Sequence, residues 1–302
     1  MQTTTLPPLP CYLNGMFGPL PDAKVSVMDR GFIFGDGVYE VVPVYDGRLF
    51  CFAEHMARLD RSLAELRMRN PLSVEKWREI ASKLIAQFDD PALGLKRKDA
   101  KNPSDQLIYI QITRGVALRD HVMPTDIEPT VFVMASAMKP PTAAQRAQGV
   151  ACVTADDFRW KKAHIKTVSL LGAVFARQIS ADVGASETVM FRDGFLSEAA
   201  ASNVWVVKDG AVFGPPRDHL VLEGIRYSLF ESICRDEGIP FTLRRISREE
   251  VLAADELLLS SATKEVLAIT TLDGQPVGNG KPGPVCARLF AAYQRAKQAN
   301  PA

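Results

Sequence analysis

The sequence predicts an α+β fold built from two domains. Three observations support this prediction: β-rich segments punctuated by Asn-Gly and Asp-Gly pairs, segments whose apolar residues recur every three or four positions, and a proline-containing polar break near the middle of the chain. The 302 residues are 47% hydrophobic and 24% charged, a composition typical of globular proteins rather than of disordered chains. This length accommodates two domains of ordinary size.

The N-terminal half combines turn signals with helical periodicity. Hairpin signals occur at Asn14-Gly15, Gly35-Asp36-Gly37 and Asp46-Gly47, beside β-rich segments such as residues 38–45. From Phe52 onward, apolar residues spaced by four and three predict a helix that continues through Leu66. The remaining predicted elements are a helix over 74–88, a polar segment at about 89–105, and strands over 106–115 and 130–138.

The predicted domain boundary is the segment MKPPTAAQRAQG, residues 138–149, in which two adjacent prolines lie within a polar stretch. We therefore expect an N-terminal domain over residues 1–139, an interdomain linker over 140–149 and a second domain over 150–302. The second half begins with a strand over 150–155. It continues with a β-meander over 187–214 that contains two Asp-Gly turns, and with helices over 225–239 and 283–298.

Charge and cysteine content exclude several classes of protein. The 36 basic and 35 acidic side chains give a net charge of +1, so neither a nucleic acid nor an acidic membrane is an expected partner. No apolar run approaches the roughly 18 residues of a spanning helix, and no signal-peptide pattern is present. The five cysteines form no CxxC pair and the four histidines are scattered. We therefore expect free thiols, a cytoplasmic location and no metal site.

Lys166 and Glu198 are the first two candidate functional residues. Lys166 is flanked by Ile165 and by the apolar run from Val168 to Leu171, and a lysine among apolar residues can serve as a Schiff-base nucleophile. The alternative is a strand-end lysine whose amine reaches solvent. Glu198 precedes a run of small residues that would let a flat ligand approach the backbone, whereas the alternative is an edge glutamate on a hairpin.

Two further segments could bind anions. Gly224 precedes an amphipathic helix, so the N–H groups of Ile225 and Arg226 could form an anion site at the helix N-terminus. Arg58, one position from the buried stripe of the first helix, could add a cation, although a surface arginine is the commoner case. Arg119 and His121 alternate on a predicted loop and could bind a carboxylate, the alternative being ordinary solvated polarity.

Together these segments resemble one family. DRGFIFGDGVYEVV, EHMARL, HIKTVSLLGAV, SEAAASNVW, LEGIR and SSATKEV occur in the order seen in class IV pyridoxal-phosphate aminotransferases, and the resemblance extends from about Tyr12 to Lys297. GDGVYEVV, TRG followed by RxH, and IKTVSLLGAV are most similar to the D-amino-acid transaminase subgroup. The resemblance implies fold type IV: a smaller N-terminal α/β domain and a larger C-terminal β-barrel-like domain flanked by helices.

The resemblance also assigns roles to individual residues. It implies pyridoxal 5'-phosphate as the cofactor, Lys166 as the Schiff-base lysine and proton shuttle, and Glu198 as the partner of the pyridine nitrogen. The other implied cofactor contacts are Arg58, Ser202, Leu222, Ile225, Arg226, Ser261 and Ala262. The implied substrate contacts are Tyr39, Val41, Arg119 and His121, of which Arg119 and His121 reach across from the neighbouring subunit of a homodimer.

Two positions depart from the family pattern. The family often has threonine where Arg226 stands and a hydroxyl residue where Ala262 stands. We therefore expect the cofactor phosphate to lose side-chain hydroxyls, which Arg226, Ser261 or Thr263 could offset.

The implied activity is ping-pong transamination of D-amino acids and small keto acids, of the type D-alanine plus 2-oxoglutarate to pyruvate plus D-glutamate. The preference for D-amino acids rests on the predicted binding of the substrate carboxylate by Tyr39, Arg119 and His121. The alternatives are a branched-chain L-aminotransferase, an (R)-amine transaminase, an aminodeoxychorismate lyase, and a binding protein with a decayed site.

Overall fold

The computed structural model describes residues 6–90 and 105–299, so most of the polar segment predicted at 89–105 lies outside the described residues. The chain divides into two compact units. The N-terminal unit runs to Met138 and includes the separate segment Ile165–Ser169, and the C-terminal unit comprises Lys139–His164 and the chain from Leu170 onward. This division differs from the sequence-based one, because Ile165–Ser169 belongs to the N-terminal unit.

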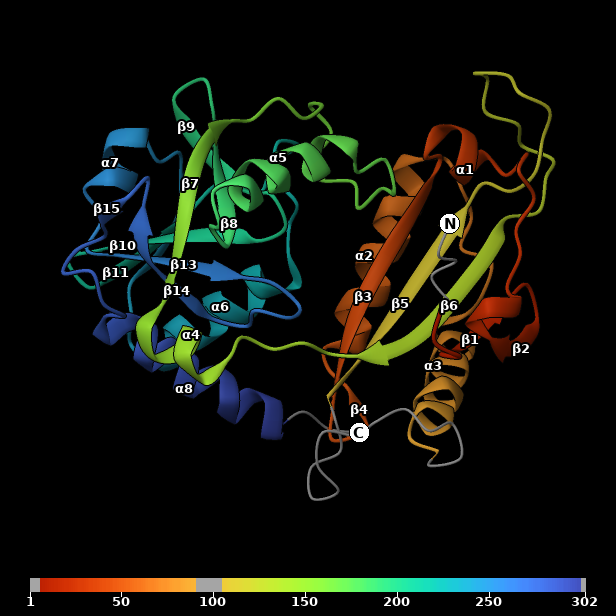
Figure 1. Cartoon of the computed structure of the whole chain (residues 1–302), viewed down its shortest axis with the longest axis horizontal. Helices are drawn as coiled ribbons and strands as arrows, with labels where there is room; N and C mark the ends of the chain where they lie inside the picture. The colour runs from red at the N-terminus through yellow and green to blue at the C-terminus, as the bar shows by residue number, and fades with distance from the viewer. Residues whose placement is uncertain (1–5, 91–104, 300–302) are drawn as a thin grey trace. The chain divides into compact units, whose positions relative to one another are not determined.

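The N-terminal unit is an antiparallel six-stranded sheet in the order β2-β1-β6-β5-β3-β4, with helices on one face (Figure 1). Its strands are β1 (Pro10–Leu13), β2 (Met16–Pro19), β3 (Gly37–Tyr45), β4 (Arg48–Leu49), β5 (Gln106–Thr113) and β6 (Thr130–Ala137). Its helices are the short 3-10 helix η1 (Leu20–Asp22), α1 (Arg30–Phe34), α2 (Phe52–Glu65) and α3 (Val74–Phe88).

Two of the three predicted hairpin turns are present. Asn14-Gly15 joins β1 to β2 and Asp46-Gly47 joins β3 to β4, and all four residues have positive φ, as a tight hairpin turn requires. The third signal marks a different structure. Gly35 is the left-handed C-cap of α1, with φ of 66°, and β3 begins two residues later. A glycine that ends a helix and one in a hairpin turn satisfy the same steric requirement, so the local sequence does not distinguish them.

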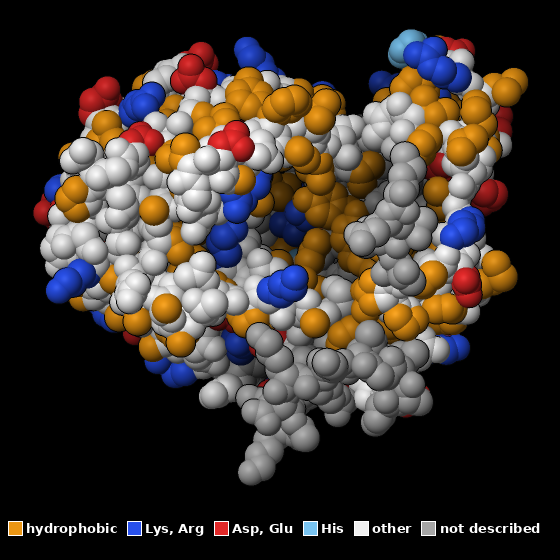
Figure 2. All heavy atoms as spheres, in the orientation of Figure 1, with side chains coloured by type: hydrophobic (Ala, Val, Ile, Leu, Met, Phe, Trp, Pro, Cys, Tyr) orange, Lys and Arg blue, Asp and Glu red, His pale blue; other side chains and the backbone are white. Residues whose placement is uncertain are grey.

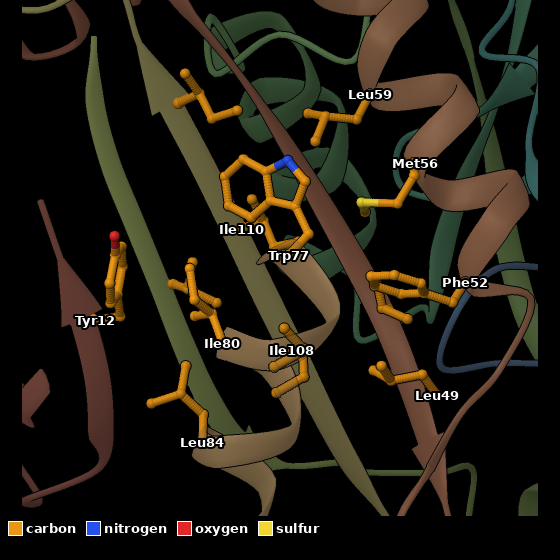
Figure 3. Close-up of a cluster of buried hydrophobic side chains, with 14 of the residues drawn as sticks. Tyr12, Leu49, Phe52, Met56, Leu59, Trp77, Ile80, Leu84, Ile108 and Ile110 are labelled. Carbon is orange, nitrogen blue, oxygen red and sulfur yellow. The ribbon is translucent and has the colours of Figure 1, made fainter. Parts of the chain in front are cut away.

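The core of the N-terminal unit lies between the sheet and α2 and α3 (Figure 3). Alternate residues of β3, β5 and β6 point to this face, for example Val42, Ile110 and Val133, and meet the apolar stripes of both helices. Leu59 and Trp77 pack there with almost no exposure. The opposite face of these strands carries half-buried residues, so the core lies on one face of the sheet and the other face is less buried.

The C-terminal unit contains a nine-stranded sheet in the order β12-β11-β10-β13-β14-β7-β8-β9, with β15 paired to β14. Its strands are β7 (Val150–Asp156), β8 (Glu187–Arg192), β9 (Phe195–Ala199), β10 (Asn203–Lys208), β11 (Ala211–Gly214), β12 (Phe241–Leu243), β13 (Glu256–Ser260), β14 (Leu267–Leu272) and β15 (Gln275–Pro276). A short turn, in which the Ala199 N–H donates to the Ser202 carbonyl at 2.8 Å, joins the end strand β9 to β10, which lies near the other end of the strand order, so the sheet curls. The predicted barrel-like sheet is confirmed.

Helices flank this curled sheet, as predicted (Figure 1). They are α4 (Ala143–Gln148), α5 (Leu171–Asp182), α6 (Ile225–Asp236), α7 (Arg248–Leu252) and α8 (Pro284–Ala299). α6 packs on β10 through aromatic contacts, with the rings of Phe230 and Trp205 stacked 4.9 Å apart. The two Asp-Gly turns join β8 to β9 and β10 to β11, but β10 pairs with β13, so the predicted meander is interrupted after β9.

The predicted linker over 140–149 is not an irregular segment. It contains α4, which begins with a capping box in which Thr142 and Gln145 exchange hydrogen bonds. The adjacent prolines precede this cap, where they do not interrupt the helical hydrogen bonds. Thus the proline-containing segment lies at the boundary between the two units, and its capping box starts a short helix there.

All five cysteines are free. Burial raises the pKa of Cys152, Cys234 and Cys286 to about 12, so these thiols stay protonated.

Within residues 6–90 and 105–299, no helix has the length and apolar character needed to cross a bilayer.

Candidate active site

Lys166 lies beside β3 on the open face of the N-terminal sheet. The Tyr39 N–H donates to the Lys166 carbonyl at 2.9 Å, and the Val168 N–H donates to the Gly37 carbonyl at 3.0 Å, so residues 166–168 follow the β3 backbone. The Lys166 Nζ lies 4.2 Å from the centroid of the Tyr39 ring, where an ammonium group is attracted by the aromatic face. The structure therefore brings together a half-buried amine and a tyrosine that were predicted to act on the cofactor and the substrate.

The surroundings of Lys166 differ from the expectation. Leu170 and Leu171 are 38% and 69% exposed, so the apolar run does not enclose the amine. The amine instead contacts the ring of Tyr39, because the backbone hydrogen bonds between Lys166 and β3 turn the lysine side chain toward that ring. Lys161, five residues earlier in the chain, is exposed.

Tyr39 and Val41 share the open face of β3. They alternate with the buried residues Val38, Glu40 and Val42, as the pleat of a strand requires. Val41 lies opposite Tyr109 of β5 in the register, and the rings of Tyr39 and Tyr109 are 5.9 Å apart. Burial, and secondarily Tyr39, raises the pKa of Tyr109 to about 12, which keeps this phenol neutral. The open face thus carries two neighbouring tyrosine rings and the Lys166 amine.

Arg58 is not a surface arginine. It is buried on α2, where its Nε and Nη2 donate to the two carboxylate oxygens of Glu40 at 2.7 and 2.8 Å. The Nδ1 of His55 lies 2.7 Å from the same carboxylate. One helical turn beyond Arg58, Ser62 accepts a hydrogen bond from the Lys166 N–H at 3.3 Å. α2 therefore holds both the candidate phosphate-binding arginine and the backbone of the candidate catalytic lysine.

The ionisation of Glu40 follows from these contacts. Burial by itself would raise the pKa of the Glu40 carboxyl, but the Arg58 guanidinium and His55 outweigh burial and hold the pKa well below its usual range. Glu40 is therefore an anion at neutral pH. Its two-point pairing with Arg58 fixes the plane of the guanidinium.

Arg119 and His121 are exposed on the loop between β5 and β6. Both contact Phe34 of α1: the Arg119 Cζ lies 5.5 Å from the ring centroid, and the His121 and Phe34 rings are 5.4 Å apart. In the part of one chain that the structure describes, no hydrogen bond, ion pair or ring contact joins either side chain to Tyr39. The structure thus brings Arg119 and His121 together with each other, but not with the third predicted carboxylate contact.

In the C-terminal unit, Glu198 is buried on β9 rather than exposed at a sheet edge. The Arg159 Nη1 donates to its Oε1 at 2.6 Å, and Asp157 holds the other side of that guanidinium through two bonds of 2.9 Å. Burial raises the pKa of the Glu198 carboxyl even though Arg159 acts in the opposite direction. A carboxylate with raised proton affinity is a strong acceptor for an N–H donor.

Arg159 is a functional candidate that the sequence reasoning passed over. In the sequence it stands in a basic stretch, residues 159–162, whereas in the structure its side chain is only 12% exposed and is paired to Glu198. The only local signal was Asp157 two residues earlier, which orients it in the fold.

Leu222 and Asn203 complete the surroundings of Glu198. The Leu222 N–H lies 3.3 Å from both carboxylate oxygens, and the Asn203 amide donates to the carboxylate at 3.2 Å and to the Leu222 carbonyl at 3.0 Å. The segment before α6 is therefore tied to the end of β9. Leu222 acts here through its backbone.

The start of α6 lacks a side-chain cap. Its N-cap is Gly224, which supplies no capping side chain, so the first N–H groups of the helix receive no acceptor from that residue. A Cβ at Gly224 would come within 2.2 Å of the Asn203 Oδ1, so this close approach requires glycine. Ile225 and Arg226 are the first two residues of α6, as the anion-site prediction required.

Arg226 extends from α6 toward the turn after β13. Its Nη2 donates to the Ala262 carbonyl at 3.4 Å, and its Cζ lies 5.7 Å from the centroid of the Tyr293 ring. In the same turn, the Ser261 Oγ accepts from the Lys264 N–H at 3.1 Å. Arg226 therefore links the N-terminus of α6 to the segment that contains Ala262.

Ser202 lies in a buried polar cluster that includes the unpredicted residue Lys264. The Ser202 Oγ donates to the Glu187 Oε1 at 2.9 Å and accepts from the Lys264 Nζ at 2.9 Å, while the same amine lies 3.1 Å from Glu187. Glu187 and Lys264 are 77 residues apart, so no local pattern could have indicated the pair. The cluster joins the β9–β10 turn to the turn after β13.

The small residues after Glu198 differ in exposure. Ala199 and Ala200 are 1% and 8% exposed, and Ala200 packs with Ala176 of α5 and Met190 of β8, whereas Ala201 is exposed. Small side chains are needed here because the helix approaches the sheet closely.

Among the described residues, no group of three or more His, Cys, Asp or Glu side chains could hold a metal ion.

Comparison with known proteins identifies the family. The family model for amino-transferase class IV matches residues 37–272. The chain belongs to the class IV aminotransferases. Enzymes of this family use pyridoxal phosphate, and residues 37–272 include Lys166, Glu198 and the start of α6.

Two curated class IV relatives have similar sequences over nearly their whole length. The D-alanine aminotransferase of Staphylococcus haemolyticus is 35% identical over 285 residues, which cover 94% of this chain and 96% of the relative. The D-alanine aminotransferase of Bacillus licheniformis is 34% identical over 281 residues, covering 93% and 94%.

Solved structures share the fold. The branched-chain amino acid aminotransferase of Escherichia coli superposes with a TM-score of 0.84 at 25% identity, over 95% of this chain and 93% of that one. A fold IV transaminase from Curtobacterium pusillum gives a TM-score of 0.79 at 25% identity, over 94% of this chain and 93% of that one. These matches confirm the predicted fold type IV architecture.

Proposed function

We propose that this class IV aminotransferase transfers amino groups between D-amino acids and keto acids, with D-alanine and 2-oxoglutarate as a representative pair. Arg119 and His121 carry the proposal, because an arginine fork and an imidazole donor in contact with one ring form a unit suited to an α-carboxylate. The similarity to D-alanine aminotransferases over nearly the whole chain supports the same substrate class.

The residues present fit pyridoxal phosphate. Lys166 offers a half-buried amine, Glu198 a buried carboxylate of raised pKa, and the glycine-capped start of α6 a set of N–H donors. When bound, this cofactor supplies an aldehyde that reacts with amines and an electron sink for the bonds at the substrate α-carbon. We assign the covalent attachment to the Lys166 Nζ.

The protein groups then have separate tasks. We propose that the Lys166 Nζ would accept the proton from the substrate α-carbon and later return it. The Glu198 carboxylate would hold the ring nitrogen of the cofactor as a hydrogen-bond acceptor. Arg159, fixed by Asp157, keeps that carboxylate in place and limits its proton affinity. Val41 and Tyr39 contact the substrate from the open face of β3.

We assign the phosphate to Arg58, to the N–H groups of Ile225 and Arg226, and to the turns that contain Ser202, Ser261 and Ala262. The Arg226 guanidinium contacts the Ala262 carbonyl, so in this proposal it braces the turn that has lost a hydroxyl. Lys264 donates to Ser202 and pairs with Glu187, so in this proposal it fixes the Ser202 hydroxyl.

We propose that the enzyme is a homodimer, in which Arg119 and His121 complete the site of the neighbouring subunit. Exposed apolar side chains support a partner surface on each unit. Leu118 and Val122 flank the carboxylate-binding pair and are 87% and 71% exposed. Hydrophobic side chains also gather on the surface over α5, where Val174 and Phe175 are exposed (Figure 2). Patches of this kind mark interaction surfaces. The free thiols, four of them buried, support a reducing cytoplasmic location.

A donor panel tests the substrate proposal. The purified holoenzyme is given D-alanine, L-leucine or (R)-1-phenylethylamine with 2-oxoglutarate, and glutamate formation is followed with its configuration. We expect D-alanine to be the best donor and D-glutamate the product. Preference for L-leucine would indicate a branched-chain aminotransferase, and preference for the amine would indicate an amine transaminase. Release of pyruvate from aminodeoxychorismate without an acceptor would indicate a lyase.

Replacing Arg119 with alanine should raise the KM for D-alanine by about ten- to a hundredfold, because a charged hydrogen-bond pair to the carboxylate is lost. Arg119 is exposed, so cofactor content and melting temperature should not change. Steady-state kinetics with D-alanine measure the effect. Lys139→Ala, a substitution of another exposed cation, is the control. An unchanged KM would contradict the assigned role.

Mixed dimers test whether Arg119 acts across subunits. Chains carrying Lys166→Ala and chains carrying Arg119→Ala are co-produced with different tags, and the heterodimer is isolated. If the arginine acts in trans, one of the two sites is intact and the heterodimer shows about half of the wild-type activity with the wild-type KM. If it acts within its own chain, the only site that keeps Lys166 lacks Arg119, and the heterodimer shows the raised KM of Arg119→Ala. A monomeric holoenzyme would contradict the proposed assembly.

A further inference from the structure

Arg119 and His121, the proposed carboxylate-binding pair, lie on an exposed loop, so other contacts must order their side chains. Arg119 and His121 are both exposed in the protomer, and so are their neighbours Leu118 and Val122. Holding a long arginine side chain in one geometry costs conformational entropy. If these side chains move freely before binding, the entropy cost of ordering them weakens substrate binding. Contacts that already fix Arg119 and His121 in the free enzyme therefore strengthen carboxylate binding.

Phe34 provides such contacts to both side chains. The Arg119 Cζ lies 5.5 Å from the ring centroid, within the range of cation–π attraction, and the His121 ring is 5.4 Å away at an interplanar angle of 45°. Phe34 is the last residue of α1 and is half-buried. It thus bridges two side chains that stand on either side of Asp120.

Arg30 holds the ring and the loop backbone in the same place. Its Cζ lies 4.8 Å from the Phe34 ring centroid, and its Nη1 donates to the Asp120 carbonyl at 2.6 Å. Arg30 is buried and paired through Nε to Asp36 at 2.8 Å, and Arg114 binds the same carboxylate at 2.8 Å. A rigid ion-pair cluster therefore anchors the peptide between Arg119 and His121.

The loop backbone at the other end is also fixed. The Arg30 N–H donates to the Gly115 carbonyl at 2.9 Å, and a Cβ at Gly115 would come within 2.0 Å of the Glu128 carbonyl oxygen. The loop is thus held at its start by backbone pairing and in its middle by Arg30. Phe34 is the contact that acts on the functional side chains themselves.

We propose that Phe34 is a positioning residue for substrate specificity: its ring orders Arg119 and His121 so that they bind an α-carboxylate. The proposal rests on the proposed function, in which these two side chains bind the substrate carboxylate. Phe34 itself need not touch the substrate. The contacts lie within one chain, so the role holds for a site in the same subunit and for one in its neighbour.

The experiment compares Phe34→Leu with Phe34→Tyr and Phe32→Leu in the holoenzyme. Leucine keeps apolar bulk but removes the aromatic face, so we expect the KM for D-alanine to rise about five- to tenfold with kcat within about twofold of wild type. Phe34→Tyr keeps the ring and should restore the wild-type KM. Phe32 lies on the same helix and is 71% exposed, so Phe32→Leu should leave KM unchanged.

A second measurement separates positioning from general damage. The inhibition constant of propionate, which offers a carboxylate but no amine, should rise in Phe34→Leu by the same factor as the KM, while the cofactor absorbance and melting temperature stay constant. Equal KM and propionate inhibition in wild type and Phe34→Leu would overturn the proposal, as would a fall in kcat with no change in KM. If the wild-type enzyme did not use D-alanine at all, the proposed function would fail instead, and propionate inhibition against its actual donor would still test Phe34.

Discussion

Replacing Lys166 with alanine should lower the rate of transamination by about 10³-fold or more, because general acid–base catalysis alone contributes about 10²- to 10⁴-fold. The Lys166 Nζ is the half-buried amine over the Tyr39 ring, and we assign to it both the covalent hold on the cofactor and the proton transfer. Single-turnover kinetics with D-alanine measure the loss. A small soluble amine added to the variant should restore part of the rate by replacing the missing base.

Lys161→Ala is the matched control, since that lysine lies five positions earlier and is exposed. It should retain wild-type activity. Borohydride treatment followed by peptide mass spectrometry should place the cofactor on the peptide that contains Lys166. Cofactor attached to the peptide of Lys264, the other partly buried amine near the proposed phosphate residues, would contradict the assignment.

Replacing Glu40 with glutamine should lower the free energy of unfolding by about 3–5 kcal/mol, the cost of removing one partner from a buried ion pair. The Glu40 carboxylate is fully buried and receives two hydrogen bonds from Arg58 and one contact from His55. Glutamine keeps the shape but removes the negative charge that faces the buried guanidinium. Chemical denaturation of the cofactor-free protein at neutral pH measures the change, and added cofactor should reduce it, because its phosphate would pair with Arg58.

The effect should depend on pH in a defined direction. The folded-state pKa of Glu40 is depressed, so its contribution to stability is fully present above the unfolded-state pKa of about 4.3 and is lost as the pH falls below that value. The difference between the wild type and Glu40→Gln should therefore shrink as the pH is lowered from about 5.

Glu79→Gln is the control for this substitution, because the Lys76–Glu79 pair is exposed and such pairs contribute about 0–1 kcal/mol. A loss of stability in Glu40→Gln no larger than in Glu79→Gln would contradict the buried-pair interpretation. So would a difference that grows in acid.

Local signals predicted much of the secondary structure. Asn14-Gly15 and Asp46-Gly47 marked real hairpins because a tight turn needs positive φ at both residues, and Asn, Asp and Gly tolerate it. The stripe from Phe52 to Leu66 marked α2 because one face of the helix packs on the sheet. The same reasoning was wrong at Gly35, where a helix end imposes an equivalent backbone requirement.

Pairings between distant residues were not predictable from local patterns. Glu40 occupies an inward position in VYEVV, which indicates a buried carboxylate but not that Arg58 and His55 neutralise it. In the sequence, Arg159 is simply one residue of a basic stretch. Its contact with Glu198, 39 residues away, is visible only in the structure. The Glu187–Lys264 pair spans 77 residues.

The sequence by itself determined the strands, most helices, the family and the residue types that its chemistry requires, because propensity, periodicity and ordered motifs are properties of neighbouring residues. Tertiary structure alone decided the electrostatic partners of these residues and their exposure. Burial and charge pairing depend on which distant segments meet, so they set the ionisation of Glu40 and Glu198, the orientation of Arg58 and the contacts of Arg119 and His121 with Phe34.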